Sequence, residues 1–431
     1  MLELFKKYIN EYKSSTLYYL NNLILAKVLN FVVTFLIINK ISDVNYGQLV
    51  FFTTWISIFL TISCLGLPLS IIKDISAAEN KISRYNYLGS LIIFSFIFTF
   101  VCEIFLLIFF FFIYPDSLDG LRSDFAIFLF LNLILNILNS VNIGFNNQIK
   151  SQIPETYFRL PILVILFFLI EDLTLPLILL LFNIMFFLTI IYTFFLSLNN
   201  FKKIFLNFFY FKFKIINIKI ITKLGLISIL SALMSRIDIV MLEYFSSLKQ
   251  VSVYNIAFLI GGATSIVAVS LNPFISTIAS REYVSKKFND TSKFLFFSRV
   301  TLVAITFFFA LLYNFFFKEF FLNYVPFSSR EALDLAFYFI IFYTIIGFIY
   351  FSETFLLMVG KENYVLKCYV FCLILNIILN YYLIQKYEAK GAIIATIVVL
   401  IILNILFYVK SKFMISNYEK HNQKKKRILI T

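Results

Sequence analysis

The stretch LYYLNNLILAKVLNFVVTFLII (residues 17–38) decides the class of fold, because it is apolar, long enough to cross a bilayer, and interrupted near its middle by Lys27. A second apolar stretch, SRIDIVMLEYF (residues 235–245), opens the second half of the chain and carries Arg236 and Asp238. A charged side chain at bilayer depth is costly and is kept where it lines a cavity or meets a partner. The two stretches therefore predict a membrane protein with polar groups inside its spans.

The composition places nearly the whole chain in a membrane. Of its 431 residues, 61% are hydrophobic and 14% are charged, whereas about a quarter of a soluble domain is charged. About twelve apolar runs are long enough to span a bilayer. They are residues 15–38, 47–72, 87–113, 123–147, 156–170, 174–198, 223–245, 252–280, 295–317, 332–359, 364–385 and 390–410. The first run is too long for a cleaved signal peptide, so we predict an uncleaved first span.

Lysine and arginine lie mainly on one side of the predicted spans. The even-numbered connections and the two ends hold 28 of the 37, including Lys150 and Arg159 in the connection 148–159, and the odd-numbered connections hold 7. Because cytoplasmic loops are enriched in these residues, we predict that both termini and the basic linker 199–223 are cytoplasmic. Topology and anionic lipid then explain the net charge of +14, and no nucleic-acid partner is expected.

The two halves carry related sequences. ISDVNYGQLVFF follows the first span and LKQVSVYNIAF follows the seventh, and placing Tyr46 on Tyr254 also places Asn30 on Asp238. We therefore predict an all-α integral membrane protein of two six-helix lobes. Repeats of this kind place a substrate site between the halves, near mid-membrane. The predicted lobes are residues 1–205 and 206–410, and a basic cytoplasmic tail follows at 411–431.

Three stretches of the chain carry a resemblance to a known family. They are ISDVNYGQLV with CLGLPLSIIKDIS, then SRIDIVMLEYFSSLKQVSVYNIAF, and finally ILNIILNYYLIQKYEAKGAIIATIVVL at residues 374–400. Together they resemble the Wzx-type flippases of polysaccharide repeat units, which share the MOP superfamily and a MATE-like fold with the MATE drug exporters and the lipid II flippases. One departure is Gln385-Lys386, where many relatives have an Ile-Pro turn.

The resemblance implies a multi-pass transporter of the bacterial cytoplasmic (inner) membrane. Its substrate would be an undecaprenyl-pyrophosphate-linked oligosaccharide, such as an O-antigen (lipopolysaccharide) or capsule repeat unit, exported by alternating access. It implies no resident cofactor, with H+ or Na+ as the coupling ion. Its partners would be the lipid-linked glycan, the bilayer, and the proteins that polymerise and assemble the polysaccharide.

Lys27 shares a helical face with Asn30 and Thr34. A cationic, polar stripe suits a pyrophosphate or an acidic sugar in a water-filled lumen. The alternative is a structural ion pair between Lys27 and Glu103 or Glu353. We favour the lumen, because intramembrane charges are functional by default.

A series of asparagines lies on one face of the fourth predicted span. Its members are Asn132, Asn136, Asn139 and Asn146. Such a stripe suits sugar hydroxyls in a hydrated cavity. Hydrogen bonding between helices, worth about 0.6 kcal/mol for each group, explains it equally well.

Arg236 and Asp238 point to different faces of the seventh predicted span, about 200° apart at 100° per residue. The repeat predicts that Asp238 faces the lumen with Asn30. Arg236 either binds a phosphate with its planar fork or pairs with a carboxylate on a neighbouring helix. Glu103 and Glu353 are proton-coupling sites or fixed counter-ions, and Asp238 is a third coupling candidate.

The sequence argues against two other classes of function. A MATE-like multidrug exporter of organic cations would favour acidic lumen residues without a mid-membrane lysine, so Lys27 argues against it. A membrane glycosyltransferase or polymerase generally needs a sizeable extracytoplasmic loop, and the longest one predicted covers only residues 317–331, so we expect no enzyme. The single histidine, His421, lies in the basic tail, and no metal site is predicted.

Overall fold

The computed structural model describes most of the chain as helix. It covers residues 15–68, 81–113, 121–144, 148–198, 218–266, 288–319 and 330–428, with isolated positions between 268 and 285. Every regular element in these ranges is a helix, which confirms the predicted all-α class. Within the same ranges, nine helices are long and apolar enough to cross a membrane, or ten if one bent pair counts as a span.

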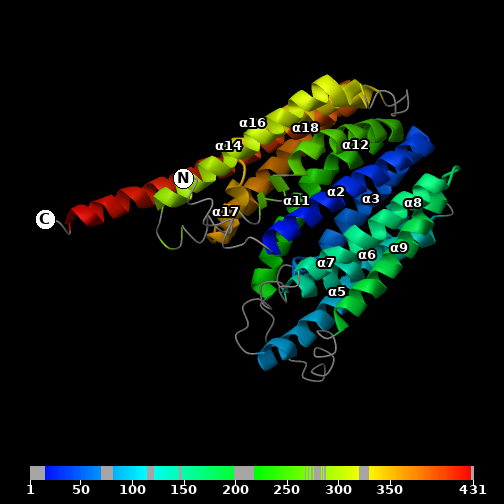
Figure 1. The fold of residues 1–431 in the computed structure, drawn as a ribbon, viewed down its shortest axis with the longest axis horizontal. Coiled ribbons are helices and arrows are strands. Elements are labelled where there is room, and N and C mark those ends of the chain that lie inside the picture. Colours follow the sequence, from blue (N-terminus) through cyan, green and yellow to red (C-terminus); the bar gives the residue numbers. More distant parts are fainter. Residues whose placement is uncertain are drawn as a thin grey trace. The chain divides into compact units, whose positions relative to one another are not determined.

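Contacts divide the chain into two compact units (Figure 1). We call Asn21–Arg236 the first unit, and Ile237–Thr431 with Met1–Leu20 the second unit. The helix α11 (Ile218–Phe245) runs from one into the other. The predicted lobe limits of 1–205 and 206–410 stay a prediction.

In the first unit, α6 packs along α9 and α3 packs along α5 (Figure 1). Its elements are α2 (Ser15–Lys40), α3 (Asp43–Cys64), α5 (Lys81–Ile113), α6 (Arg122–Gly144), α7 (Gln148–Ile153), the π-helical turn η1 (Pro154–Arg159), α8 (Leu160–Leu169) and α9 (Leu175–Leu196).

In the second unit, α16 packs against both α12 and α14. Its elements are α12 (Leu248–Gly262), the 3-10 turn η3 (Ala263–Ser265), α14 (Phe288–Leu312), the π-helical turn η4 (Tyr313–Phe317), α16 (Glu331–Gly347), α17 (Ser352–Met358) and α18 (Glu362–Ile428). Serine caps begin corresponding helices of the two units, with Ser42 accepting from the Asn45 amide before α3 and Ser247 from the Gln250 amide before α12.

The last two predicted spans both lie in α18. A break at Glu388, with φ 48° and ψ −129°, separates them. Three residues later, a Cβ at Gly391 would lie 2.1 Å from the Leu383 carbonyl oxygen, so this close approach requires glycine. The break falls between residues 385 and 390, where the sequence predicts a turn.

The fifth span begins earlier than the sequence predicts. Helix is already present in α7, and the apolar stretch that can cross a membrane runs from Lys150 to Leu169. Pro154 does not end the helix, because π-helical turns can re-satisfy the backbone groups that a proline frees. Arg159, which the sequence analysis counts in a cytoplasmic connection, therefore lies inside a candidate span.

Candidate functional site

Lys27 lies on α2 with its side chain exposed. Among the described residues it takes part in no hydrogen bond or ion pair. Next along the same face, Asn30 is half-buried, and its backbone carbonyl accepts from the Thr34 hydroxyl at 2.8 Å. Within the described part of the chain, the polar face predicted for this helix therefore presents an ammonium group without a partner.

Both ends of α2 are fixed by side-chain hydrogen bonds within the first unit. Near one end, the Tyr157 hydroxyl donates to Asn22 Oδ1 at 2.6 Å. At the other, Lys40 Nζ donates to the carbonyls of Phe168 and Ile170, at 3.1 and 2.5 Å. These hydrogen bonds fix α2 on either side of Lys27, and they could not be predicted from the sequence because their partners lie more than 100 residues away.

Glu103 is fully buried on α5. Its Oε1 accepts from Ser63 on α3 at 3.4 Å, and its Oε2 has no hydrogen-bond partner within the described part of the chain. The alternative ion pair between Lys27 and Glu103 is therefore not formed. A carboxylate buried without a cation is costly when ionised, so a bound proton or cation would stabilise it.

The asparagines of α6 are half-buried and differ in their partners. Asn132 donates to the Phe128 carbonyl of its own helix at 2.8 Å, and Asn136 reaches Cys64 Sγ on α3 at 3.9 Å. Asn139 Oδ1 is buried, with no partner in the described ranges. Asn136 thus contacts a neighbouring helix, whereas Asn132 bonds only within α6, and Asn139 keeps an unmet acceptor among the described residues. Whether this face binds sugar hydroxyls stays a prediction. Asn146 lies outside the described residues.

Asp238 lies in the second unit and is only 1% exposed. Its Oδ2 accepts from Tyr254 on α12 and from Thr396 on α18, the latter at 3.1 Å, and its Oδ1 accepts from the Ile239 amide. This carboxylate ties three helices together. Arg236, two residues earlier on α11, is half-buried. Whether either residue binds substrate stays a prediction.

Glu353 follows a break between two helices of the second unit. The axes of α16 and α17 differ by 49°, and Phe351 at the break has φ 68°. Glu353 is half-buried, and its Oε1 accepts from the Tyr369 hydroxyl at 2.7 Å. Broken helices in transporters can form binding sites for ions and substrates, so the coupling role of Glu353 stays open.

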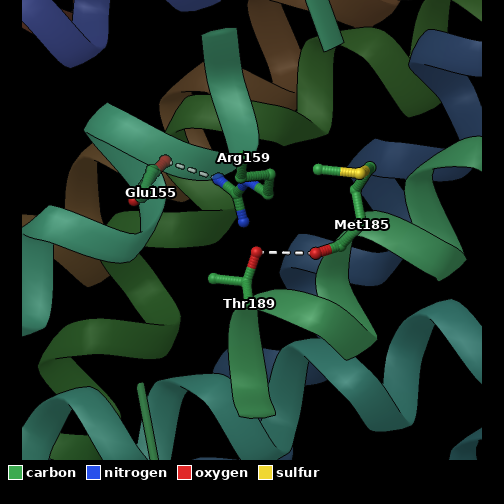
Figure 2. Close-up of polar contacts among 4 residues, drawn as sticks. All are labelled: Glu155, Arg159, Met185 and Thr189. Atoms are coloured by element: carbon green, nitrogen blue, oxygen red, sulfur yellow. Dashed lines mark hydrogen bonds and ion pairs between the residues drawn. The ribbon is translucent and has the colours of Figure 1, made fainter. Parts of the chain in front are cut away.

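The structure adds one intramembrane cation that the sequence analysis did not treat as a site residue. Arg159 is 7% exposed, and its Nη2 lies 2.5 Å from Glu155 Oε1. Its guanidinium also lies 4.2 Å from the centre of the Phe186 ring on α9. Figure 2 shows it turned toward Glu155, with Met185 and Thr189 of α9 beside it. The spacing of four between Glu155 and Arg159 is the signal from which this pair could have been found.

Comparisons with known proteins identify the fold. Residues 224–382 match the MatE family model, and no curated protein matches the chain. An inward-facing multidrug resistance MATE family transporter of the MOP superfamily is similar with a TM-score of 0.74, covering 94% of this chain and 99% of its own at 12% identity. The chain has the fold of the MATE transporters.

Two further solved structures show the same likeness. A MOP superfamily transporter from Pyrococcus furiosus is similar at 12% identity and TM-score 0.63, over 94% of this chain and 96% of its own. A MATE transporter from Vibrio cholerae is similar at 13% identity and TM-score 0.63, over 96% of this chain and 98% of its own. The matched family and folds belong to transporters, in agreement with the expectation of no enzyme.

Proposed function

We propose that the chain is a flippase that moves an undecaprenyl-pyrophosphate-linked oligosaccharide repeat unit across the bacterial cytoplasmic membrane by alternating access. One observation carries the proposal: Lys27 lies inside a candidate span with its ammonium group exposed and, in the part of the chain that the structure describes, with no carboxylate partner. A cation at that depth is stabilised by an anion. The pyrophosphate of a lipid-linked glycan supplies one, and its bonds to an ammonium group are charge-assisted.

The other predicted site residues take roles that follow from their chemistry. Asn139 would offer its unmet carbonyl oxygen to a sugar hydroxyl, and Asn132 and Asn136 would do so by giving up their contacts with Phe128 and Cys64. Arg236 offers a planar fork that can hold two phosphate oxygens, whereas Lys27 acts as a point charge. The sugar part of the cargo would therefore contact polar side chains, while its charged pyrophosphate end contacts the cations.

An ion gradient would drive the transport cycle through a carboxylate that binds and releases the coupling ion. Glu103 has the strongest claim to this role, because one of its oxygens is buried without a partner among the described residues. Asp238 and Glu353 already accept hydrogen bonds from hydroxyl groups. The coupling ion is H+ or Na+, and the polysaccharide polymerase and assembly proteins would receive the exported unit.

Export of organic cations is the second candidate, because two of the matched structures are multidrug resistance MATE family transporters. Lys27 would repel a cationic drug from the face that it occupies. The Pyrococcus furiosus transporter is described as having a binding pocket of reverse polarity that suggests a different function. A MATE-like fold is therefore compatible with more than one charge of cargo.

The test is a surface-glycan assay in the source bacterium, with its own copy of the gene deleted and variants supplied from a plasmid. We expect Lys27→Ala to abolish surface glycan and Lys27→Arg to restore it, at equal protein levels. The matched control is Lys367→Ala, which removes an exposed lysine near the start of α18. Wild-type glycan with Lys27→Ala would show that the central observation has no bearing on transport.

A further inference from the structure

A pocket of about 420 Å³ lies in the second unit, between the first turns of α14 and the C-terminal part of α18. Its polar lining consists of Ser292, Arg299, Tyr408, Ser411, Lys412 and Ser416. Among the described residues that line it, none is acidic. Two cations and four hydroxyl groups thus face one cavity. The Ser411 and Ser416 hydroxyls donate to the Tyr408 and Phe413 carbonyls, so each would have to rotate to donate to an anion instead.

Arg299 is held in place by hydrogen bonds, and no carboxylate in the described part of the chain neutralises it. Its Nε donates to the Tyr350 carbonyl and its Nη2 to the Ser352 hydroxyl, both at 2.9 Å, and its guanidinium lies 4.9 Å from the centre of the Tyr408 ring. Among the described residues, no carboxylate lies within ion-pair distance of it. A half-buried guanidinium without a counter-ion favours an anion at the remaining face.

Lys412 brings a second positive charge to the same ring. Its Nζ lies 6.0 Å from the centre of Tyr408, and its side chain is exposed. Within the described ranges it too pairs with no carboxylate. An arginine fork, a lysine and serine hydroxyls around one cavity form a typical phosphate-binding set.

The pocket lies at the ends of two candidate membrane spans, which is where phospholipid headgroups would meet the protein. Its residues fall at the start of the candidate span Ser292–Phe317 and at the end of the span Glu362–Ser416. Its apolar floor includes the buried Leu295 and Ile415, while Phe296 at its side is 63% exposed. A ligand with a phosphate and an adjoining hydrocarbon chain would match both the polar and the apolar walls.

We propose that this pocket binds the phosphate headgroup of an anionic phospholipid, separately from the transported cargo. Basic pockets between membrane helices at the cytoplasmic surface bind anionic headgroups in this way. The sequence predicts that this end of the second unit is cytoplasmic, because the connection 281–299 and the chain from residue 410 onward are both rich in lysine and arginine. Arg299 also bonds to the break before α17, so the bound headgroup would neutralise a group that supports that break.

The test measures lipid retention by the purified full-length protein, using native mass spectrometry after mixing with phosphatidylglycerol or phosphatidylcholine. We expect wild type to retain phosphatidylglycerol preferentially, and Lys412→Glu to reduce that retention about tenfold or more, because it reverses one charge in the pocket. The matched control, Lys367→Glu, makes the same charge change near the other end of α18 and should leave retention unchanged. Arg299→Lys, which keeps the charge and loses the fork, should reduce retention less than Lys412→Glu does.

Three results would overturn the proposal. Equal retention of the two lipids by wild type would remove the headgroup selectivity. Equal losses with Lys412→Glu and Lys367→Glu would show a general surface-charge effect. Displacement of phosphatidylglycerol by millimolar inorganic phosphate would assign the site to a free phosphate instead of a lipid.

Discussion

Lys27 in the first unit and Asp238 in the second both lie on helices that open the predicted repeat, yet their surroundings differ. Lys27 is exposed and, among the described residues, has no hydrogen-bond or ion-pair partner. Asp238 is 1% exposed and accepts hydrogen bonds from Tyr254 and Thr396. The first is available to a ligand, whereas the second must lose existing bonds before it can bind one. On these two helices, one charge is therefore left accessible and the other joins helices.

The ends of these two helices give the repeat a different register from the tyrosine alignment. The opening helix ends at Lys40 in the first unit and at Phe245 in the second, so the helix ends are 205 residues apart (245 − 40). The alignment of Tyr46 with Tyr254 instead gives an offset of 208 residues (254 − 46). Matching the helix ends places Asn30 on Ser235 instead of Asp238. Three residues are nearly one helical turn, so the change moves an equivalent side chain by about 60° around the axis.

The largest effect on stability is expected at Arg159, a cation of the first unit that, unlike Lys27, has a carboxylate partner. Glu155→Gln leaves its guanidinium buried and unpaired, and should lower the free energy of unfolding by roughly 3 kcal/mol. This loss is at the low end of the range expected when a buried ion pair is broken, because the Glu155 side chain is 35% exposed. Thermal unfolding in detergent measures it. The double variant Glu155→Gln with Arg159→Gln should recover part of the loss, and equal stability of the single and double variants would contradict the account.

The next largest effect is expected at Asp238. Asp238→Ala leaves the hydroxyls of Tyr254 and Thr396 buried without their acceptor, which should cost roughly 2–3 kcal/mol. The same unfolding assay measures this loss, with Lys27→Ala as the control that should unfold like wild type. If Lys27→Ala proved as unstable as Asp238→Ala, the contrast between an available and a structural charge would fail.

A smaller effect is expected when one donor to Asp238 is removed. Tyr254→Phe keeps the ring and deletes the hydroxyl, and should lower the free energy of unfolding by about 1 kcal/mol. Thr396→Val deletes the other donor and should act similarly. A double-mutant cycle between Tyr254→Phe and Asp238→Ala measures the coupling, and strict additivity of the two losses would show that the hydrogen bond does not contribute.

The sequence predicted the helical class and most spans, because long apolar runs need only local information. It placed Arg159 near the start of the span 156–170 but missed that the span begins earlier, because a charged residue beside Pro154 and Pro161 is typical of a span end and the π-helical turn is not visible in composition. It also could not predict the partners of buried polar groups. Asp238 and Thr396 are 158 residues apart in the chain, so only the packed fold brings them together.

A still smaller effect on stability is expected at Glu103. Glu103→Gln keeps the shape and removes the ionisable group, so its free energy of unfolding should change by less than about 1 kcal/mol. Transport in vesicles should lose its dependence on a proton or sodium gradient in this variant. The control is Glu362→Gln in the first turn of α18, which should keep that dependence. Wild-type transport that ignores both gradients would remove the coupling role of Glu103.

The smallest effect on stability and the most direct test of transport are both expected at Lys27. Purified protein in vesicles would be given a fluorescent undecaprenyl-pyrophosphate-linked sugar, and its movement between leaflets followed by quenching from outside. Wild type and Lys27→Arg should move the lipid-linked sugar, and Lys27→Ala should slow it at least about tenfold, the cost of losing one charge-assisted contact. Movement at the wild-type rate by correctly folded Lys27→Ala would contradict the proposal that this lysine binds the charged end of the cargo.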